Sequence, residues 1–180
     1  AKVFRTFIAT NIVKKSLKNP PIAVKPESTE FEKIYVAKYA NLQAAITCNH
    51  KKGIDPKNPA SITSIAKYEE SMKKKIELIN ALKTDLKGKN WKTEKQKSRL
   101  IERVQKLEFQ VKLQKETREY NLGTSLRNYI DPRVFRSWMN IVELDWNRMY
   151  TSTLQRKFLW VDNITTVSYT HLTLPTTSRV

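Results

Sequence analysis

Residues 122–133 read Leu122-Gly123-Thr124-Ser125-Leu126-Arg127-Asn128-Tyr129-Ile130-Asp131-Pro132-Arg133 and contain a marked helix start. Asp131 followed by Pro132 is typical of a helix N-terminus, because the carboxylate can accept hydrogen bonds from the first backbone N–H groups and the fixed φ of proline suits the first helical position. Apolar residues then recur at helical spacing: Val134, Phe135, Trp138, Met139 and Val142. We therefore expect an amphipathic helix from residue 132, with Tyr129 on the turn that leads into it.

Tyr129 lies between two basic residues, Arg127 and Arg133. A helix N-terminus carries partial positive charge, so together with these arginines it could hold a phosphate beside the phenol oxygen. The simpler interpretation is a half-buried packing residue whose hydroxyl reaches the surface. The residues of this segment leave both interpretations open.

The composition indicates a folded, strongly basic protein. Among 180 residues, 34 are Lys or Arg and 17 are Asp or Glu, which gives a net charge of +17, while the hydrophobic content of 39% is ordinary for a globular chain. Such a charge points to a polyanion, either nucleic acid or an acidic membrane surface. The apolar runs are too short to cross a bilayer, so nucleic acid is favoured and no membrane partner is expected.

The sequence offers little support for metal or nucleotide chemistry. Its single cysteine, Cys48, excludes an internal disulfide and a Cys-based zinc cluster. It fits a reducing, intracellular location, and we interpret it as a small buried residue on a helix rather than a reactive thiol. Because we find no Gly-rich phosphate loop, paired metal carboxylates or His/Cys cluster, we expect neither cofactor nor metal.

The first fifty residues predict two helical segments. In residues 1–19 the apolar positions are Phe4, Phe7, Ile8, Ile12 and Leu17, which suggests a helix, or a strand that passes into one, with Arg5 among buried neighbours. An arginine in that setting is commonly a surface residue whose stem covers apolar neighbours. Prolines at 20, 21 and 26 break the pattern, and the spacing of Thr29 and Glu32 predicts a capping box.

The helix that follows this box should run to about Asn49. Its predicted apolar stripe comprises Phe31, Ile34, Tyr35, Leu42, Ala45 and Ile46, and three polar residues should lie off the stripe: Lys33, Lys38 and Gln43. His50 follows the helix and precedes Lys51 and Lys52. By itself this pattern indicates a C-terminal capping residue in favourable contact with the helix dipole.

Two long polar helices are predicted between residues 61 and 118. Apolar residues recur at spacings of three and four, first at Ile65, Tyr68, Met72, Ile76, Ile79, Leu82 and Leu86, then at Leu100, Val104, Leu107 and Val111, with Gln114 continuing the second series. Gly88-Lys89-Asn90-Trp91 supplies the reversal, so an antiparallel coiled-coil hairpin is expected. Its many lysines either form a solvated face or contact DNA through counterion release.

The C-terminal part predicts a small helical domain. Asp145 and Trp146 restart the helical pattern, and a short last helix should bury Leu154, Phe158 and Val161. Three tryptophans fall here, and we interpret Trp138, Trp146 and Trp160 as core residues rather than base-stacking groups.

Residues 122–133 closely resemble the C-terminal active-site signature of type IB DNA topoisomerases. Lys2-Val3-Phe4-Arg5-Thr6 is similar to the family's core segment that bears a catalytic arginine, and Cys48-Asn49-His50 is similar to its histidine segment. The hairpin lies where the family has a coiled-coil linker, and residues 153–160 resemble its terminal helix. This last segment looks closer to archaeal members than to animal ones.

The resemblance implies a role for each matched residue. Tyr129 would attack a DNA phosphodiester and form a 3′-phosphotyrosyl bond, so that supercoils relax without ATP. Arg5 would hold a non-bridging phosphate oxygen, and His50 would donate a hydrogen bond that stabilises the transition state. The expected DNA-binding residues are Lys2, Lys51, Lys52, Arg127 and Arg133.

The resemblance also implies an incomplete catalytic set. The family's second arginine and its lysine general acid would precede Ala1, so we expect the C-terminal part of a longer monomeric enzyme that binds double-stranded DNA together with its own N-terminal core. Alone, this chain should bind DNA weakly and show little turnover. The expected location is the nucleus in a eukaryote, or the cytoplasm and nucleoid in an archaeon.

The fold class expected is mainly α, in four parts. These are the end of the catalytic core (1–60), the linker hairpin (61–118), the tyrosine domain (119–163) and a non-native tail (164–180) that resembles translated sequencing-adapter sequence. Two alternatives remain: a tyrosine recombinase, against which the long hairpin argues, and a non-catalytic basic coiled-coil protein that binds nucleic acid.

Overall fold

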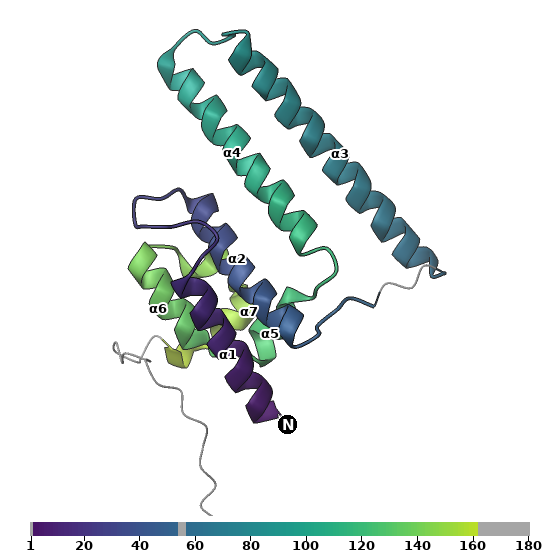
Figure 1. Ribbon diagram of the computed structural model, residues 1–180, viewed down its shortest axis with the longest axis vertical. Helices are drawn as coiled ribbons and strands as arrows, with labels where there is room; N and C mark the ends of the chain where they lie inside the picture. The colour runs from purple at the N-terminus through teal and green to yellow at the C-terminus, as the bar shows by residue number, and fades with distance from the viewer. Residues whose placement is uncertain (1, 54–56, 162–180) are drawn as a thin grey trace, which may run out of the picture. The chain divides into compact units, whose positions relative to one another are not determined.

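The computed structural model describes residues 2–53 and 57–161, and its regular elements there are helices (Figure 1). They are α1 (Lys2–Lys18), α2 (Glu30–Thr47), α3 (Pro59–Lys87), α4 (Glu94–Glu116), α5 (Leu122–Asn128), α6 (Pro132–Val142) and α7 (Ser152–Lys157), with the short 3₁₀ helices η1 (Trp146–Arg148) and η2 (Leu159–Val161). The mainly α prediction is confirmed. The predicted tail, residues 164–180, lies outside the described residues.

The chain forms two compact units. The body combines Ala1–Lys51 with Glu119–Val180, and the hairpin unit comprises Lys52–Arg118. The segments before and after the hairpin thus share one core, in which α1 packs on α2 and α6 while α2 packs on α5.

The core of the body is built around small residues of α1 and α2. Ala9 and Val13 are fully buried in one cluster with Ala37, Ala40 and Ala44. Small side chains let the two helix backbones approach closely, and this selects the face of α1 that is buried.

The predicted apolar face of α1 was therefore wrong in part. Phe4 is 60% exposed and Ile8 is 45% exposed, and Arg5 is exposed rather than set among buried neighbours. The alternation of Phe and Ile did not reveal that Ala9, Thr10 and Val13 form the face that packs on the body.

Helix α2 begins as predicted. The carboxylate of Glu32 accepts the Thr29 backbone N–H at 2.9 Å and the Thr29 hydroxyl at 2.7 Å, and the capping box is confirmed. Lys33 was expected on the exposed face, but it is buried, and its Nζ donates to the Pro26 carbonyl at 2.6 Å. Ile46 was expected in the apolar stripe, but it is 41% exposed.

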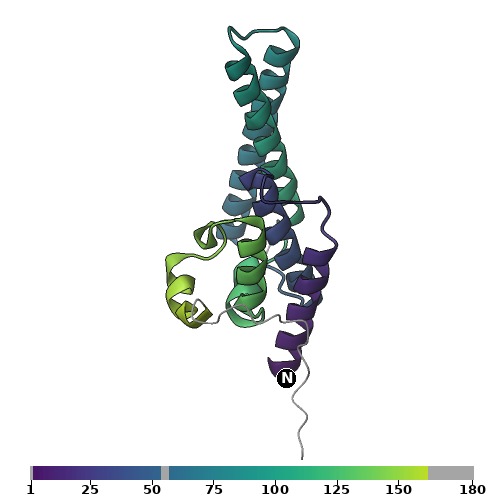
Figure 2. The same cartoon turned by 90° about the vertical axis from the view of Figure 1, so that its left-hand side faces the viewer.

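The hairpin unit consists of α3 and α4, which lie side by side and run antiparallel in both views (Figures 1 and 2). Ile79, Leu82 and Val104 form its buried seam, flanked by Leu86 and Leu107. Across the pair, Lys83 Nζ lies 2.6 Å from Glu108 Oε1, and Lys75 Nζ donates to Gln114 Oε1 at 2.6 Å.

Helix α3 begins at Pro59, just before the hairpin start predicted at residue 61, and the Asn58 side chain accepts the Ala60 N–H at 2.9 Å as an N-cap. At the predicted reversal, Lys89 adopts a left-handed conformation with φ 53°. Ile76, expected in the seam, is 40% exposed.

Aromatic rings fill the C-terminal part of the body. The Tyr150 ring stacks on Trp146 with centroids 3.7 Å apart and meets Phe135 and Phe158 edge-on. Trp146 is buried, and Trp138 packs against the same cluster. Trp160, expected in the core, is 46% exposed, and the Arg133 guanidinium carbon lies 5.7 Å from its ring centroid.

Candidate active site

The turn that carries Tyr129 is fixed at both ends. The N–H groups of Tyr129 and Ile130 both donate to the Ser125 carbonyl, at 3.0 and 3.1 Å, so α5 ends at the tyrosine. Helix α6 then begins where the sequence predicted, with the Asp131 carboxylate accepting the Arg133 backbone N–H at 3.0 Å. Tyr129 therefore lies between the C-terminal end of α5 and the N-cap of α6.

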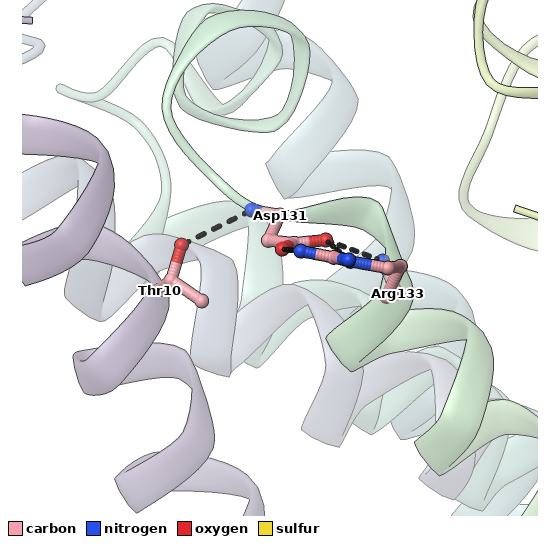
Figure 3. Close-up of polar contacts among 3 residues, drawn as sticks. All are labelled: Thr10, Asp131 and Arg133. Carbon is pink, nitrogen blue, oxygen red and sulfur yellow. Dashed lines mark hydrogen bonds and ion pairs between the residues drawn. The ribbon is translucent and has the colours of Figure 1, made fainter. Parts of the chain in front are cut away.

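Helix α1 also holds this turn. The Thr10 hydroxyl accepts the Asp131 backbone N–H at 3.1 Å, and Figure 3 shows Thr10 on α1 pointing at that group. In the same view the N–H edge of the Arg133 guanidinium lies beside the Asp131 carboxylate, with Nε–Oδ1 at 2.8 Å and Nη2–Oδ2 at 2.5 Å. The start of α6 is thus joined to α1 although the two are far apart in sequence.

His50 is positioned by the end of α2. Asn49 adopts a left-handed conformation with φ 54°, the N–H of His50 donates to the Ala45 carbonyl at 2.9 Å, and that of Asn49 donates to Ile46 at 3.0 Å. This pair of bonds is a Schellman ending, in which asparagine is one of the residues that tolerates the left-handed position. The sequence Cys48-Asn49-His50 therefore fixes where the imidazole leaves the helix.

The end of α2 is also bonded to the start of α5. The His50 carbonyl accepts the Asn121 N–H at 2.7 Å, Lys51 pairs with Tyr120 in an antiparallel bridge, and the Asn41 amide donates to the Leu122 carbonyl at 3.1 Å. These bonds make His50 and α5 a single local framework.

His50 and Tyr129 meet within this framework. Their ring centroids are 5.0 Å apart with an interplanar angle of 31°, and both side chains are half-buried. Nδ1 of the same imidazole lies 2.6 Å from Oγ of Ser125, which is fully buried. The imidazole therefore contacts both the tyrosine ring and a buried hydroxyl.

Arg5 acts on the same histidine through its charge. Burial lowers the pKa of His50, and the positive charge of Arg5 lowers that pKa further. The same charge partly offsets the rise that burial causes in the pKa of the Cys48 thiol. The charge of Arg5 therefore reaches His50, and the lowered pKa of His50 favours the neutral imidazole.

The remaining basic candidates differ in their surroundings. Lys2, Lys51 and Arg127 are exposed. Arg133 forms a bidentate ion pair with Asp131. In the hairpin unit, Lys52 Nζ donates to the Arg118 carbonyl at 3.0 Å.

Sequence reasoning missed Ser125 and Thr10, which bond to the two sides of the Tyr129 turn. The sequence shows a serine four residues before Tyr129, but only tertiary folding brings its partner His50 next to it. No periodic signal marks such a contact.

Two features concern the described part of the chain as a whole. Among residues 2–53 and 57–161, no helix has the length and apolar character that a bilayer span requires. Over the same ranges, no group of three or more His, Cys, Asp or Glu residues is placed to hold a metal ion.

Two models of known protein families match this sequence. Residues 1–86 match the model of the eukaryotic DNA topoisomerase I catalytic core, and residues 101–171 match that of the C-terminal topoisomerase domain. The chain belongs to the type IB DNA topoisomerases. It corresponds to a fragment of such a protein that contains part of the core and the C-terminal domain.

Individual relatives agree with this assignment. The chain is 30% identical to DNA topoisomerase 1 of Drosophila melanogaster over 94% of its own length, and 31% identical to DNA topoisomerase 1 of Caenorhabditis elegans over 93%. It is also 30% identical, over 89%, to the human protein named DNA topoisomerase I, mitochondrial. The chain spans 17%, 20% and 28% of these relatives, respectively.

The C-terminal match ends at residue 171, inside the segment for which a non-native origin was expected. The boundary of that segment stays a prediction.

Proposed function

We propose that this chain supplies the nucleophile of a type IB DNA topoisomerase, which relaxes supercoiled DNA through a transient single-strand break. The observation that carries the proposal is the 5.0 Å separation between the rings of His50 and Tyr129. These two residues come from segments that resemble the family's histidine and tyrosine motifs. A shared site is what a phosphate-centred reaction needs.

In the proposed reaction the phenol oxygen of Tyr129 attacks a DNA phosphorus atom, and the phenol proton is released to solvent. The bond from phosphorus to the 5′ oxygen breaks, the strand beyond it leaves as a 5′ hydroxyl, and a 3′-phosphotyrosyl ester remains. The reverse attack restores the strand, so the bond energy is conserved and no nucleotide cofactor is consumed. The proton for the leaving oxygen comes from a lysine that the family resemblance assigns to a segment outside this chain.

Arg5 and His50 stabilise the charge that grows on the phosphate. A guanidinium can donate two N–H groups to the non-bridging oxygens, and a neutral imidazole can donate one. Both act most strongly where water is partly excluded, as it is around the half-buried His50. His50 serves here as a hydrogen-bond donor.

Basic side chains near the site hold the DNA backbone without reading its sequence. Exposed Lys2, Lys51 and Arg127 are the strongest candidates, joined by Lys52. Arg133 contributes less, because its charge is largely balanced by the Asp131 carboxylate.

The proposed partner in the protein is an upstream catalytic core. Helix α1 buries Ala9, Thr10 and Val13 on one side and exposes Phe4 and Ile8 on the other. A helix that is apolar on both sides is typical of a buried position in a larger protein, so the exposed side would be covered by that core. The assembled enzyme would act as a monomer.

We place the enzyme in the nucleus, since the relatives named above are eukaryotic, and one of them bears a mitochondrial name. An archaeal source, with a cytoplasmic, nucleoid-associated enzyme, is the alternative.

The proposal is tested by trapping the covalent intermediate. The complete reading frame that contains this chain is incubated with a suicide DNA substrate, whose cleaved strand cannot be rejoined, and adducts are separated on a denaturing gel. Tyr129→Phe should abolish the adduct, because phenylalanine has no oxygen to attack phosphorus. Tyr120→Phe, a nearby tyrosine outside the site, should retain it. An adduct that survives Tyr129→Phe contradicts the assignment.

Assays on the same protein distinguish a topoisomerase from a tyrosine recombinase and from a non-catalytic coiled-coil protein. Relaxation of a supercoiled plasmid of unrelated sequence identifies a topoisomerase, whereas a tyrosine recombinase would require its own target site. DNA binding with neither adduct nor relaxation would favour the non-catalytic coiled-coil protein.

A further inference from the structure

Ser125 is bonded to both of the residues that the proposed reaction brings together. Its carbonyl accepts the Tyr129 N–H at 3.0 Å, and its Oγ lies 2.6 Å from Nδ1 of His50. The residue is fully buried, so its hydroxyl has no access to bulk water. The hydroxyl of Ser125 is therefore committed to the imidazole.

The surroundings of this imidazole favour its neutral form. Burial and the charge of Arg5 both lower the pKa of His50, so the neutral ring predominates at pH 7. The titratable and charged groups near it are Arg5 on α1, Tyr129 on the turn after α5, and Cys48 and Lys51, which are close to it in the chain. Among the described residues, the charged group that shifts the pKa of this imidazole is the Arg5 guanidinium, which lowers it.

A neutral imidazole can donate from only one nitrogen, and the other nitrogen must then accept. The Ser125 hydroxyl can either donate a hydrogen bond to Nδ1 or accept one from it. If Nδ1 donated to Ser125, Nε2 would present a lone pair, which would repel an anionic phosphate. If Ser125 donated to Nδ1, Nε2 would keep the proton and could donate.

We propose that Ser125 donates its hydroxyl proton to Nδ1 of His50 and thereby holds the imidazole proton on Nε2, where it can reach the scissile phosphate. Ser125 is a positioning residue, since it acts on the reaction through His50. This inference rests on the proposed function, in which His50 is a donor to phosphate.

The pH dependence of cleavage tests the inference in the complete reading frame. Ser125→Ala should slow single-turnover cleavage at pH 7.5 by about tenfold, because the proton is then shared between the two ring nitrogens and one hydrogen bond is lost. As the pH falls through the lowered pKa of His50, the ring gains a second proton and both nitrogens can donate, whatever residue 125 is. The ratio of wild-type to variant rates should therefore shrink toward one.

Ser125→Thr keeps a hydroxyl at the same position and should restore most of the rate at pH 7.5. A purely structural role would give a ratio that is the same at every pH, and that result would overturn the proposal. Circular dichroism of each variant shows whether the fold is retained.

A second measurement does not require catalysis. In the 180-residue chain, ¹⁵N-labelled histidine reports the tautomer directly, and His171→Gln leaves His50 as the single histidine. We expect the Nε2–H form at neutral pH, with a shift toward a mixture in Ser125→Ala. An Nδ1–H form in the wild type would overturn the proposal. Because this readout needs no DNA, it separates failure of the tautomer assignment from failure of the proposed function.

Discussion

Asp131 joins three backbone and side-chain groups around the Tyr129 turn. Its carboxylate accepts the Arg133 backbone N–H and the Arg133 guanidinium, and its own N–H donates to Thr10 on α1. The two charged side chains are only 12% and 26% exposed for Asp131 and Arg133, so their pairing is better shielded from solvent than an ordinary surface ion pair. The residue therefore couples the start of α6 to the rest of the body.

Substitution of Asp131 should separate these contributions. Asp131→Ala loses both the cap and the ion pair and should lower the free energy of unfolding by about 2 kcal/mol. Asp131→Ser restores a cap without the charge and should recover about 1 kcal/mol of that loss. Urea unfolding of the 180-residue chain measures both values. If the serine variant were no more stable than the alanine variant, the capping role would be refuted.

At the residue level, the sequence predicted the helix starts, because these depend on residues close together in the chain. Asp131 with Pro132, and Thr29 with Glu32, are pairs within one helical turn, and both helix starts lie where the pairs indicate. The bond from Ser125 to His50 joins residues 75 positions apart, so only the folded body reveals it. The burial of Lys33 was hidden for the same kind of reason, since its partner is a carbonyl in the preceding proline-rich loop.

At the scale of elements, periodicity predicted the hairpin better than it predicted α1. In the hairpin one apolar stripe meets one partner helix, so spacings of three and four identify the seam of Ile79, Leu82 and Val104. Helix α1 has apolar residues on several sides, and periodicity alone cannot choose between them. Helix α5 was not predicted, because its Asn121 cap and its seven residues give too short a pattern.

The hairpin seam can be tested with a buried and an exposed position of the same helix. Leu82 is 6% exposed, and Leu82→Ala should lower the local stability of α3 and α4 by about 2–3 kcal/mol through lost burial and the cavity left behind. Ile76 is 40% exposed, and Ile76→Ala should cost less than about 1 kcal/mol. Amide hydrogen exchange in the two helices reports both changes. Equal losses at the two positions would show that the seam is misassigned.

At the scale of the whole molecule, the hairpin interrupts the body without breaking its site. The chain leaves the body at Lys51 and returns at Glu119, and the pairing of Lys51 with Tyr120 brings those two ends together. The bond of 2.7 Å from the Asn121 N–H to the His50 carbonyl lies directly beside this junction. A short link could therefore close the body in place of the hairpin.

Replacing residues 62–116 by a short Gly-Ser bridge should leave DNA cleavage by the complete protein largely intact. Relaxation should become more sensitive to salt, because many lysines that can displace counterions are removed. A salt titration of plasmid relaxation, run beside the suicide-substrate assay, measures both effects. Complete loss of cleavage in a folded variant would contradict a peripheral role for the hairpin.

The order of motifs along the chain was informative at this largest scale. Arg5, His50, the hairpin and Tyr129 follow one another as the family resemblance implies, and the body brings segments from before and after the hairpin into one unit. The geometry that joins them could not be read from the sequence, since it depends on helix packing and on the Schellman ending at Asn49.

The most direct measurement of the central claim is the identity of the amino acid that carries DNA in the trapped intermediate. The adduct is digested with nuclease and protease, and the nucleotide-bearing peptide is sequenced by tandem mass spectrometry. We predict a single modified peptide in which the Tyr129 oxygen is esterified to a 3′-phosphate. Modification at any other residue, or linkage through a 5′-phosphate, would contradict the account.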